Sequence, residues 1–203
     1  MAMRAALGCK LHTGWAMLVA LAGQPGEIRL LFRGRIELLP LDESIPRFVY
    51  HEAAELSLPR ATALVNSARE AAQKAARLAI KDVLRELDSR GAKADVCGVL
   101  SSSTLVPDDL SRILQSHPLI HAAEGALFQQ ALISACESCG LAVTAVRQRE
   151  VWSRAAAAWG LAEPELRKEV DAVRTSMGAP WSVDHKAAAA VALLAIKPAL
   201  KPR

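Results

Sequence analysis

The sequence has few aromatic residues and lacks the short motifs that usually identify an enzyme. Aromatic side chains make up 4% of the 203 residues, which argues against an exposed platform on which nucleobases stack. No Gly-x-Gly-x-x-Gly, Gly-x-x-x-x-Gly-Lys-Ser/Thr or Gly-x-Ser-x-Gly pattern occurs. The usual sequence evidence for a dinucleotide-binding enzyme, a P-loop enzyme or an α/β-hydrolase is therefore missing.

Long apolar runs and linker-like segments are also missing. The run 187–196 is shorter than the roughly 20 residues that a membrane-spanning helix needs. Residues 15–22 are apolar after a basic start, as in a signal peptide, but Lys10 and His12 interrupt that pattern and the segment also suits a strand. We expect one domain over residues 1–196, a short basic tail over 197–203, and no association with membranes.

Cysteine is scarce, and its placement favours a reduced, cytoplasmic protein. Three of the four cysteines lie inside apolar strand or helix patterns, where the thiol behaves as a small apolar group. Cys136 and Cys139 have the spacing of half a redox or zinc site, but no second pair exists and Gly140 indicates the end of a helix. We therefore expect these two cysteines to be structural.

Positive charge is concentrated in one segment. The net charge is +4, and residues 60–93 hold eight basic and four acidic residues, whereas the remainder of the chain holds seventeen of each. Within the segment, Arg69, Arg77, Lys81 and Arg85 fall on one four-residue row of a predicted helix, and the last three form the tighter stripe. Such a stripe could follow the phosphates of DNA or RNA, although exposed basic helices are also common in proteins that bind neither.

Hydrophobic patterning predicts an α/β domain. Short apolar or alternating runs separated by turn signals predict three strands at 5–11, 15–21 and 28–38. The segment 39–59 is interpreted as a connection with one short strand or turn at 48–51. Beyond it we expect a long helix at 59–90, a strand at 96–100, a helix at 119–139, a strand at 141–146, and helices at 150–159, 164–177 and 183–196.

Two segments come close to zinc-protease motifs. His51 to Glu55 reads His-Glu-Ala-Ala-Glu, and His121 to Gly125 reads His-Ala-Ala-Glu-Gly, so each lacks one histidine and neither could hold zinc by itself. His121 and Glu124 are three residues apart on a predicted helix and therefore share a face. This pair could serve a metal or catalytic site, or it could only stabilise the start of the helix.

The last predicted helix begins with two polar residues and is otherwise almost wholly apolar. Asp184 and His185 follow Ser182, which is a suitable N-cap. An acid at this position either has a metal-binding or catalytic role, or interacts favourably with the positive end of the helix dipole.

The order of elements and the C-terminal residues together resemble RuvC-type Holliday-junction resolvases of the RNase H-like superfamily. That family has a three-stranded meander, alternating helices and strands, and a last helix that begins Asp-x-x-Asp-Ala-Leu-Ala-x-Ala. The matching segments here are 149–152, 159–160, 167–170 and 184–192. The resemblance implies a mixed sheet in which the first three strands form an antiparallel meander, the fourth and fifth run parallel to the first, and the long helix is the crossover.

The resemblance also implies a two-metal nuclease site that this chain does not complete. Family members hold two Mg²⁺-type ions with three or four carboxylates, on the first strand, at the end of the fourth strand and on the last helix. At those positions this chain has Cys9 and Lys10, Ser101 to Ser103, and Ala187, so that only Asp184 matches. Lys10, if it points inward, would repel metal ions and pair with Asp184.

We therefore expect an RNase H-like protein that has a degenerate active site, lacks nuclease activity and associates with DNA or RNA. One alternative is a hydrolase with a non-standard site, and its candidate catalytic residues are Asp184, Glu124, His121 and His185, with Glu55 as a further relocated acid. Asp184 and Glu124 could hold at most one weakly bound Mg²⁺, and we expect no other cofactor. The other alternative is a non-catalytic scaffold that binds protein partners.

Overall fold

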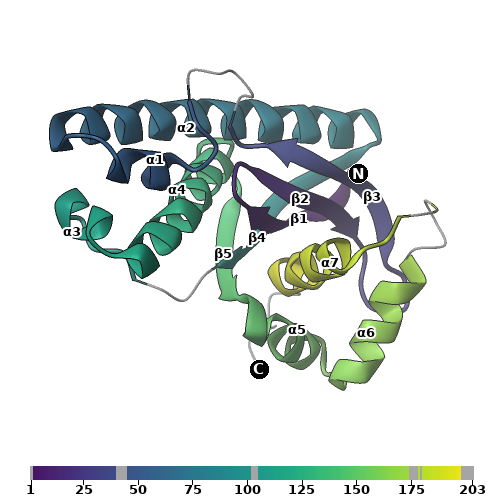
Figure 1. Ribbon diagram of the computed structural model, residues 1–203. Coiled ribbons are helices and arrows are strands. Elements are labelled where there is room, and N and C mark those ends of the chain that lie inside the picture. The colour runs from purple at the N-terminus through teal and green to yellow at the C-terminus, as the bar shows by residue number, and fades with distance from the viewer. Residues whose placement is uncertain (1, 40–44, 102–104, 174–177, 179, 198–203) are drawn as a thin grey trace.

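The computed structural model describes residues 2–39, 45–101, 105–173, 178 and 180–197 (Figure 1). Three consecutive strands come first, a pair of helices precedes each of the two later strands, and helices alone follow the last strand. The strands are β1 (Met3–His12), β2 (Trp15–Ala22), β3 (Arg29–Glu37), β4 (Ala92–Ser101) and β5 (Ala142–Arg147). The helices are α1 (Val49–Ala54), α2 (Leu58–Ser89), α3 (Leu110–Leu114), α4 (His117–Ser138), the 3-10 turn η1 (Gln148–Glu150), α5 (Val151–Trp159), α6 (Glu163–Ala172) and α7 (Val183–Ile196).

The five strands form one mixed sheet in the order β3-β2-β1-β4-β5. β1 pairs with β2 in an antiparallel manner, and β2 pairs likewise with β3. β4 lies parallel to β1, and β5 lies parallel to β4. The long helix α2 carries the chain from the meander to β4. The predicted meander, the two added parallel strands and the crossover helix are all confirmed.

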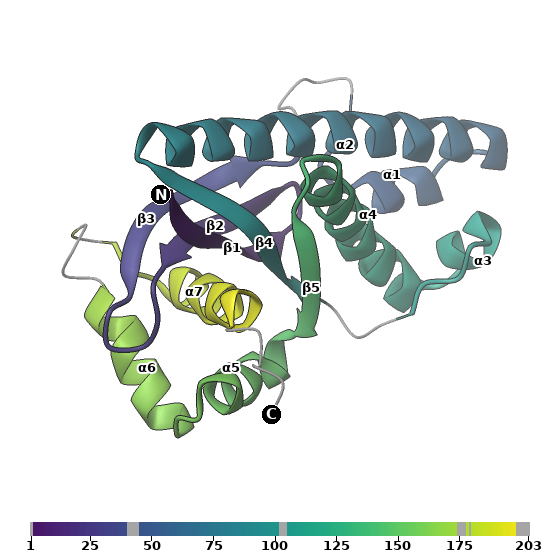
Figure 2. The same cartoon turned by 180° about the vertical axis from the view of Figure 1, so that it is seen from behind.

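Helices cover both faces of the sheet, as the two opposite views show (Figures 1 and 2). Helices α1, α2 and α4 pack on one face, and α5, α6 and α7 pack on the other. Side chains alternate between the two faces along each strand. On β1, Leu7 and Cys9 belong to the core under α2 and α4, whereas Ala6 belongs to the core under α7.

Two glycines bring α7 into contact with the backbone of the sheet. A Cβ atom on Gly8 would lie 2.0 Å from the carbonyl oxygen of Ala188, and one on Gly98 would lie 2.3 Å from that of Val191. The alanine-rich sequence of α7 has the same explanation, because small side chains let the helix approach β1 and β4 closely. This contact fixes the start of α7 near the carboxyl ends of the parallel strands.

Two short helices differ from the sequence-based predictions. Residues 48–51 were predicted as a short strand or turn but begin helix α1, because Glu124 of α4 accepts hydrogen bonds from the backbone N–H groups of Tyr50 and His51. Helix α3 was not predicted, although Asp109 caps it through its side chain.

Other predicted segments reach beyond the described residues. The helix predicted to Met177 ends at Ala172, and residues 174–177 lie outside the described part of the chain. Residues 198–203 of the predicted basic tail also lie outside it. None of the helices in the described ranges is long and apolar enough to cross a bilayer.

Candidate functional site

Asp184, the one acid that matches the resolvase pattern, pairs with a histidine at the end of β1. Its Oδ2 atom lies 2.8 Å from Nε2 of His12, and both side chains are about two-thirds buried. The His12 ring stacks on the indole of Trp15 with 4.1 Å between ring centroids, and the guanidinium of Arg35 lies 4.5 Å from the centroid of that indole. The carboxylate of Asp184 is therefore paired with the His12 imidazole, which stacking on Trp15 holds in place at the carboxyl end of β1.

Lys10 does not pair with Asp184 as the sequence had suggested. Its Nζ donates a hydrogen bond to Oε1 of Gln148, directly after β5. His12 lies two residues further along the same face of β1, and its imidazole, not Lys10, pairs with the carboxylate of Asp184. The first-strand position that carries an acid in resolvases thus presents an ammonium group here, and its partner Gln148 is a neutral amide.

Cys9, the other residue at that position, faces the opposite layer. Its Sγ lies 3.9 Å from Sγ of Cys97, and both thiols are fully buried. A hydrogen bond to Cys97, together with burial, raises the pKa of Cys136 far above its ordinary value. All four cysteines are free. The thiols thus belong to the core and add no ligand at the edge near Asp184.

A basic cleft of about 700 Å³ lies beside the start of α7. Its lining residues are Gln148, Arg149, Trp152, Arg167, Val183, Lys186 and Ala187. They include three cations and no acid. The guanidinium of Arg167 lies 4.1 Å from the centroid of the Trp152 indole, and this cation–π contact holds it at one wall of the cleft.

Acidic residues around the cleft neutralise its cations only in part. Glu150 is within 3.5–3.9 Å of three guanidinium groups, those of Arg147, Arg149 and Arg154. Two acids of α6 pair with lining cations: Asp171 lies 2.8 Å from Lys186, and Glu163 lies 2.7 Å from Arg167. Because three arginines share one carboxylate and Lys10 pairs with an amide, this edge of the sheet carries a positive surplus that favours anionic ligands.

His185 belongs to the cap of α7. The backbone N–H of Ser182 donates to its Nδ1 at 3.1 Å, and the Ser182 hydroxyl oxygen accepts from the backbone N–H of His185. These two bonds form a capping box at the start of the helix. Burial lowers the pKa of His185, Arg33 lowers it further, and Asp184 opposes both effects.

A second polar group lies where α1 meets the start of α4, and three of its members are histidines. One ligand atom from each of His51, His117 and His121 lies within 4.8 Å of the others. Glu124 is 3% exposed, and its Oε1 lies 3.2 Å from Nδ1 of His51. The sequence had indicated His121 and Glu124 but had given His117 no role, although the four-residue spacing of the two α4 histidines was a usable signal.

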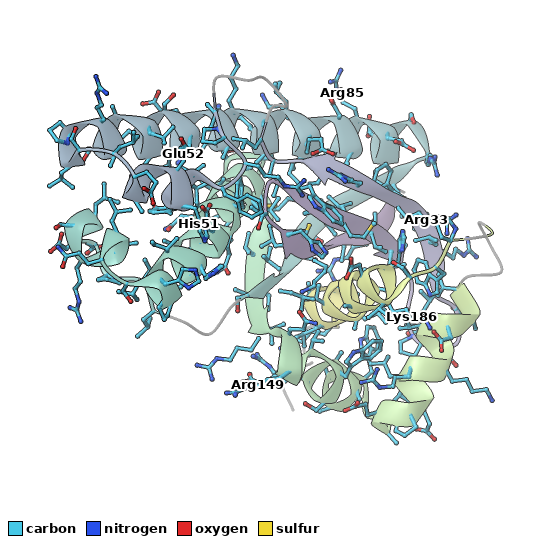
Figure 3. All side chains as sticks on the ribbon, viewed as in Figure 1. Arg33, His51, Glu52, Arg85, Arg149 and Lys186 are labelled. Atoms are coloured by element: carbon cyan, nitrogen blue, oxygen red, sulfur yellow. The ribbon has the colours of Figure 1, made fainter. Side chains whose placement is uncertain are left out.

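The candidate catalytic residues therefore divide into two groups. His121 and Glu124 lie on α4, in the layer of α1 and α2, whereas Asp184 and His185 lie on α7, on the opposite face of the sheet. Figure 3 shows His51 beside α1 and α4, well away from α7. The expectation that Asp184 and Glu124 share one ion is therefore corrected. Glu55, the further relocated acid, is exposed at the end of α1.

The predicted basic row is exposed along α2, but it is not one continuous stripe. Arg69 turns toward Tyr50, whose pKa is raised chiefly by burial. Arg77 and Lys81 line a shallow hollow, and Arg85 pairs with Asp82. In Figure 3 Arg85 points away from the sheet, whereas Arg149 and Lys186 lie in the layer of α5 and α7. The molecule thus presents two separate basic surfaces.

Among described residues that could ligate a metal, no group of three converges at Asp184, and the histidine cluster is the group that does converge. The residues at the edge thus do not fit a pair of Mg²⁺ ions, which require several carboxylates. Asp184 is the matched acid, and the neighbouring positions hold Lys10 and the small side chain of Ala187.

Comparisons with known proteins identify the fold. No family model and no curated protein matches the sequence. The solved structures of similar fold include Thermus thermophilus RuvC in complex with Holliday junction substrate, at 15% identity and a TM-score of 0.50, covering 94% of this chain and 91% of that one. Another structure of Thermus thermophilus RuvC matches at 16% identity and a TM-score of 0.50, covering 94% and 92%. The protein therefore has the RNase H-like fold in its RuvC-type form.

Proposed function

We propose that this protein binds nucleic acid along the basic edge beside α7 and does not cleave it by two-metal chemistry. The observation that carries the proposal is that positively charged side chains occupy the edge where resolvases carry acidic ones. Lys10 stands at the first-strand position, the cleft is lined by Arg149, Arg167 and Lys186, and the one matched acid is paired with His12.

Phosphate is the ligand chemistry that suits this arrangement. Guanidinium and ammonium groups bind phosphate oxygens directly, and each contact releases condensed counterions from the nucleic acid. The RuvC structure of similar fold is in complex with Holliday junction substrate, which makes branched DNA the first ligand to examine. The scarcity of aromatic residues favours contacts to the backbone over stacking of bases.

The test compares two variants that each remove three positive charges. One carries Lys10→Gln, Arg149→Gln and Lys186→Gln at the edge, and the other carries Arg77→Gln, Lys81→Gln and Arg85→Gln on α2. Binding of labelled branched, duplex and single-stranded DNA and of RNA is measured by fluorescence anisotropy over a range of salt concentrations. We expect the edge variant to flatten the slope of log K against log salt by about 0.9 for each lost duplex phosphate contact.

The α2 variant should leave that slope nearly unchanged. If the α2 variant loses the slope and the edge variant keeps it, the interface is the basic row on α2 and the proposed edge is wrong. If the unmodified protein binds no DNA or RNA at low salt, the nucleic-acid function itself is wrong, and a scaffold for protein partners becomes the better hypothesis.

A further inference from the structure

We infer that His51, His117 and His121 form a binding site for one zinc-class divalent ion. The site lies in the layer of α1 and α4, on the face of the sheet opposite α7, and it is independent of the proposed nucleic-acid interface. Each near-motif of the sequence lacks a ligand by itself, but the fold brings the histidine of one motif to the histidine of the other.

The geometry is close to that of a three-histidine metal site. His117 and His121 are four residues apart on α4 and present their rings to one another with centroids 4.4 Å apart. His51 approaches from α1, with its ring centroid 4.7 Å from that of His121. Nitrogen ligands of a tetrahedral zinc ion lie about 3.4 Å apart, given zinc–nitrogen bonds of about 2.0–2.1 Å. Since the three ligand atoms already lie within 4.8 Å of one another, small side-chain rotations complete the site.

Glu124 gives the cluster a feature that ring packing alone does not explain. Its Oε1 accepts the backbone N–H groups of Tyr50 and His51 and lies 3.2 Å from Nδ1 of His51. Its Oε2 is buried and has no hydrogen-bond partner among the described residues. A buried carboxylate with one unsatisfied oxygen is costly, and a divalent ion held by the adjacent imidazoles would offset that cost.

The carboxylate also orients a ligand. A histidine that binds a metal through one nitrogen usually donates its other ring N–H to a carboxylate or carbonyl. Glu124 engages Nδ1 of His51, which leaves Nε2 as the ligand atom. Three imidazoles select a borderline ion such as Zn²⁺, Co²⁺ or Ni²⁺ over Mg²⁺, which prefers oxygen ligands. Three protein ligands leave a fourth position for water or a ligand oxygen.

The experiment is a titration of the full-length, metal-free protein with Zn²⁺ by calorimetry and with Co²⁺ by visible absorption. We expect one ion per chain and the d–d absorption of tetrahedral Co²⁺ with nitrogen ligands, and excess Mg²⁺ should not compete. Each of His51→Gln, His117→Gln and His121→Gln should abolish this one-to-one binding. Glu124→Gln should weaken it by about 10- to 100-fold.

Two other residues of ligand type provide matched controls. His12→Gln removes a histidine on the other face of the sheet, and Cys139→Ser removes the half-buried thiol; both variants should bind as the unmodified protein does. Circular dichroism of each histidine variant should show an intact fold, as expected for His117 and His121, which are exposed. Stoichiometric binding that survives all three histidine variants, or no binding of Zn²⁺ or Co²⁺ by the unmodified protein, would overturn the inference.

Discussion

At the scale of single residues, two glycines of the sheet contact the backbone of α7 so closely that neither position has room for a side chain. Gly98 lies on β4, and a Cβ atom there would come within 2.3 Å of the carbonyl oxygen of Val191. A flexible side chain could turn aside, but a helix carbonyl can move only if the helix moves with it. The whole of α7 would have to shift away from the sheet.

Gly98→Ala should therefore lower the free energy of unfolding by about 3 kcal/mol, at the upper end of the usual cost of overpacking. Gly125→Ala is the matched control, because Gly125 lies inside α4 and a Cβ atom added there would meet nothing within 4 Å. That substitution should raise stability by about 0.5–1 kcal/mol. Urea denaturation measures both, and an equal effect of the two substitutions would contradict the tight contact.

At the scale of elements, the first turn of α7 depends on a neutral imidazole. The Ser182 backbone N–H donates to Nδ1 of His185, and protonation of Nδ1 removes that acceptor. Burial lowers the pKa of His185, so the unfolded chain binds a proton more readily than the folded one. The contribution to stability is present above the ordinary histidine pKa of about 6.5 and declines as the pH falls toward the lowered value.

His185→Gln should remove this pH dependence while it keeps the capping box, since glutamine suits the same helix position. Thermal unfolding of the two proteins between about pH 7.5 and about pH 5 is the measurement. The unmodified protein should lose more stability than the variant over this range. Parallel curves would mean that the cap does not respond to protonation of His185.

The elements show which features local sequence patterns could predict. The short apolar runs at 5–11 and 15–21, bounded by turn signals, and the long run 59–90 predicted strands and a helix that the structure contains, with ends shifted by a few residues. Helix α1 could not be predicted in this way, because its first N–H groups bond to Glu124, far along the chain. The histidine cluster was missed for the same reason, since His51 and His117 meet only in the folded protein.

At the scale of the whole molecule, the sheet separates two surfaces of different chemistry. The layer of α5, α6 and α7 carries the basic cleft, and the layer of α1, α2 and α4 carries the histidine cluster and the basic row. The resemblance in sequence had led to the correct fold, and it had identified Asp184 as the one matched acid. It could not predict that His12 would engage that acid, because the pattern that identified Asp184 covers the last helix and does not extend to the end of the first strand.

The purified protein should not cleave branched, duplex or hybrid nucleic acids above background with Mg²⁺ or Mn²⁺. Two such ions carry four positive charges, but the positions that hold metal ligands in resolvases supply a single carboxylate here. That carboxylate, on Asp184, is already paired with His12. Gel assays with each substrate are the measurement. Metal-dependent cleavage that persists through repurification and disappears in Asp184→Asn would contradict this prediction and the non-catalytic part of the proposed function.

The close seating of α7 also limits how the protein can respond to a ligand. The carbonyl oxygens of Ala188 and Val191 lie directly over Gly8 and Gly98, so at these two points the backbone of the helix meets the backbone of the sheet with no side chain between them. Shear is a small sliding of packed elements, and sliding here would drive these carbonyl oxygens toward the strand residues on either side of each glycine, which carry a Cβ atom. We therefore expect the backbone of α7 to stay in place when a ligand binds at the basic edge. The long side chains of Lys10, Arg149 and Lys186 would then make any adjustment to the ligand.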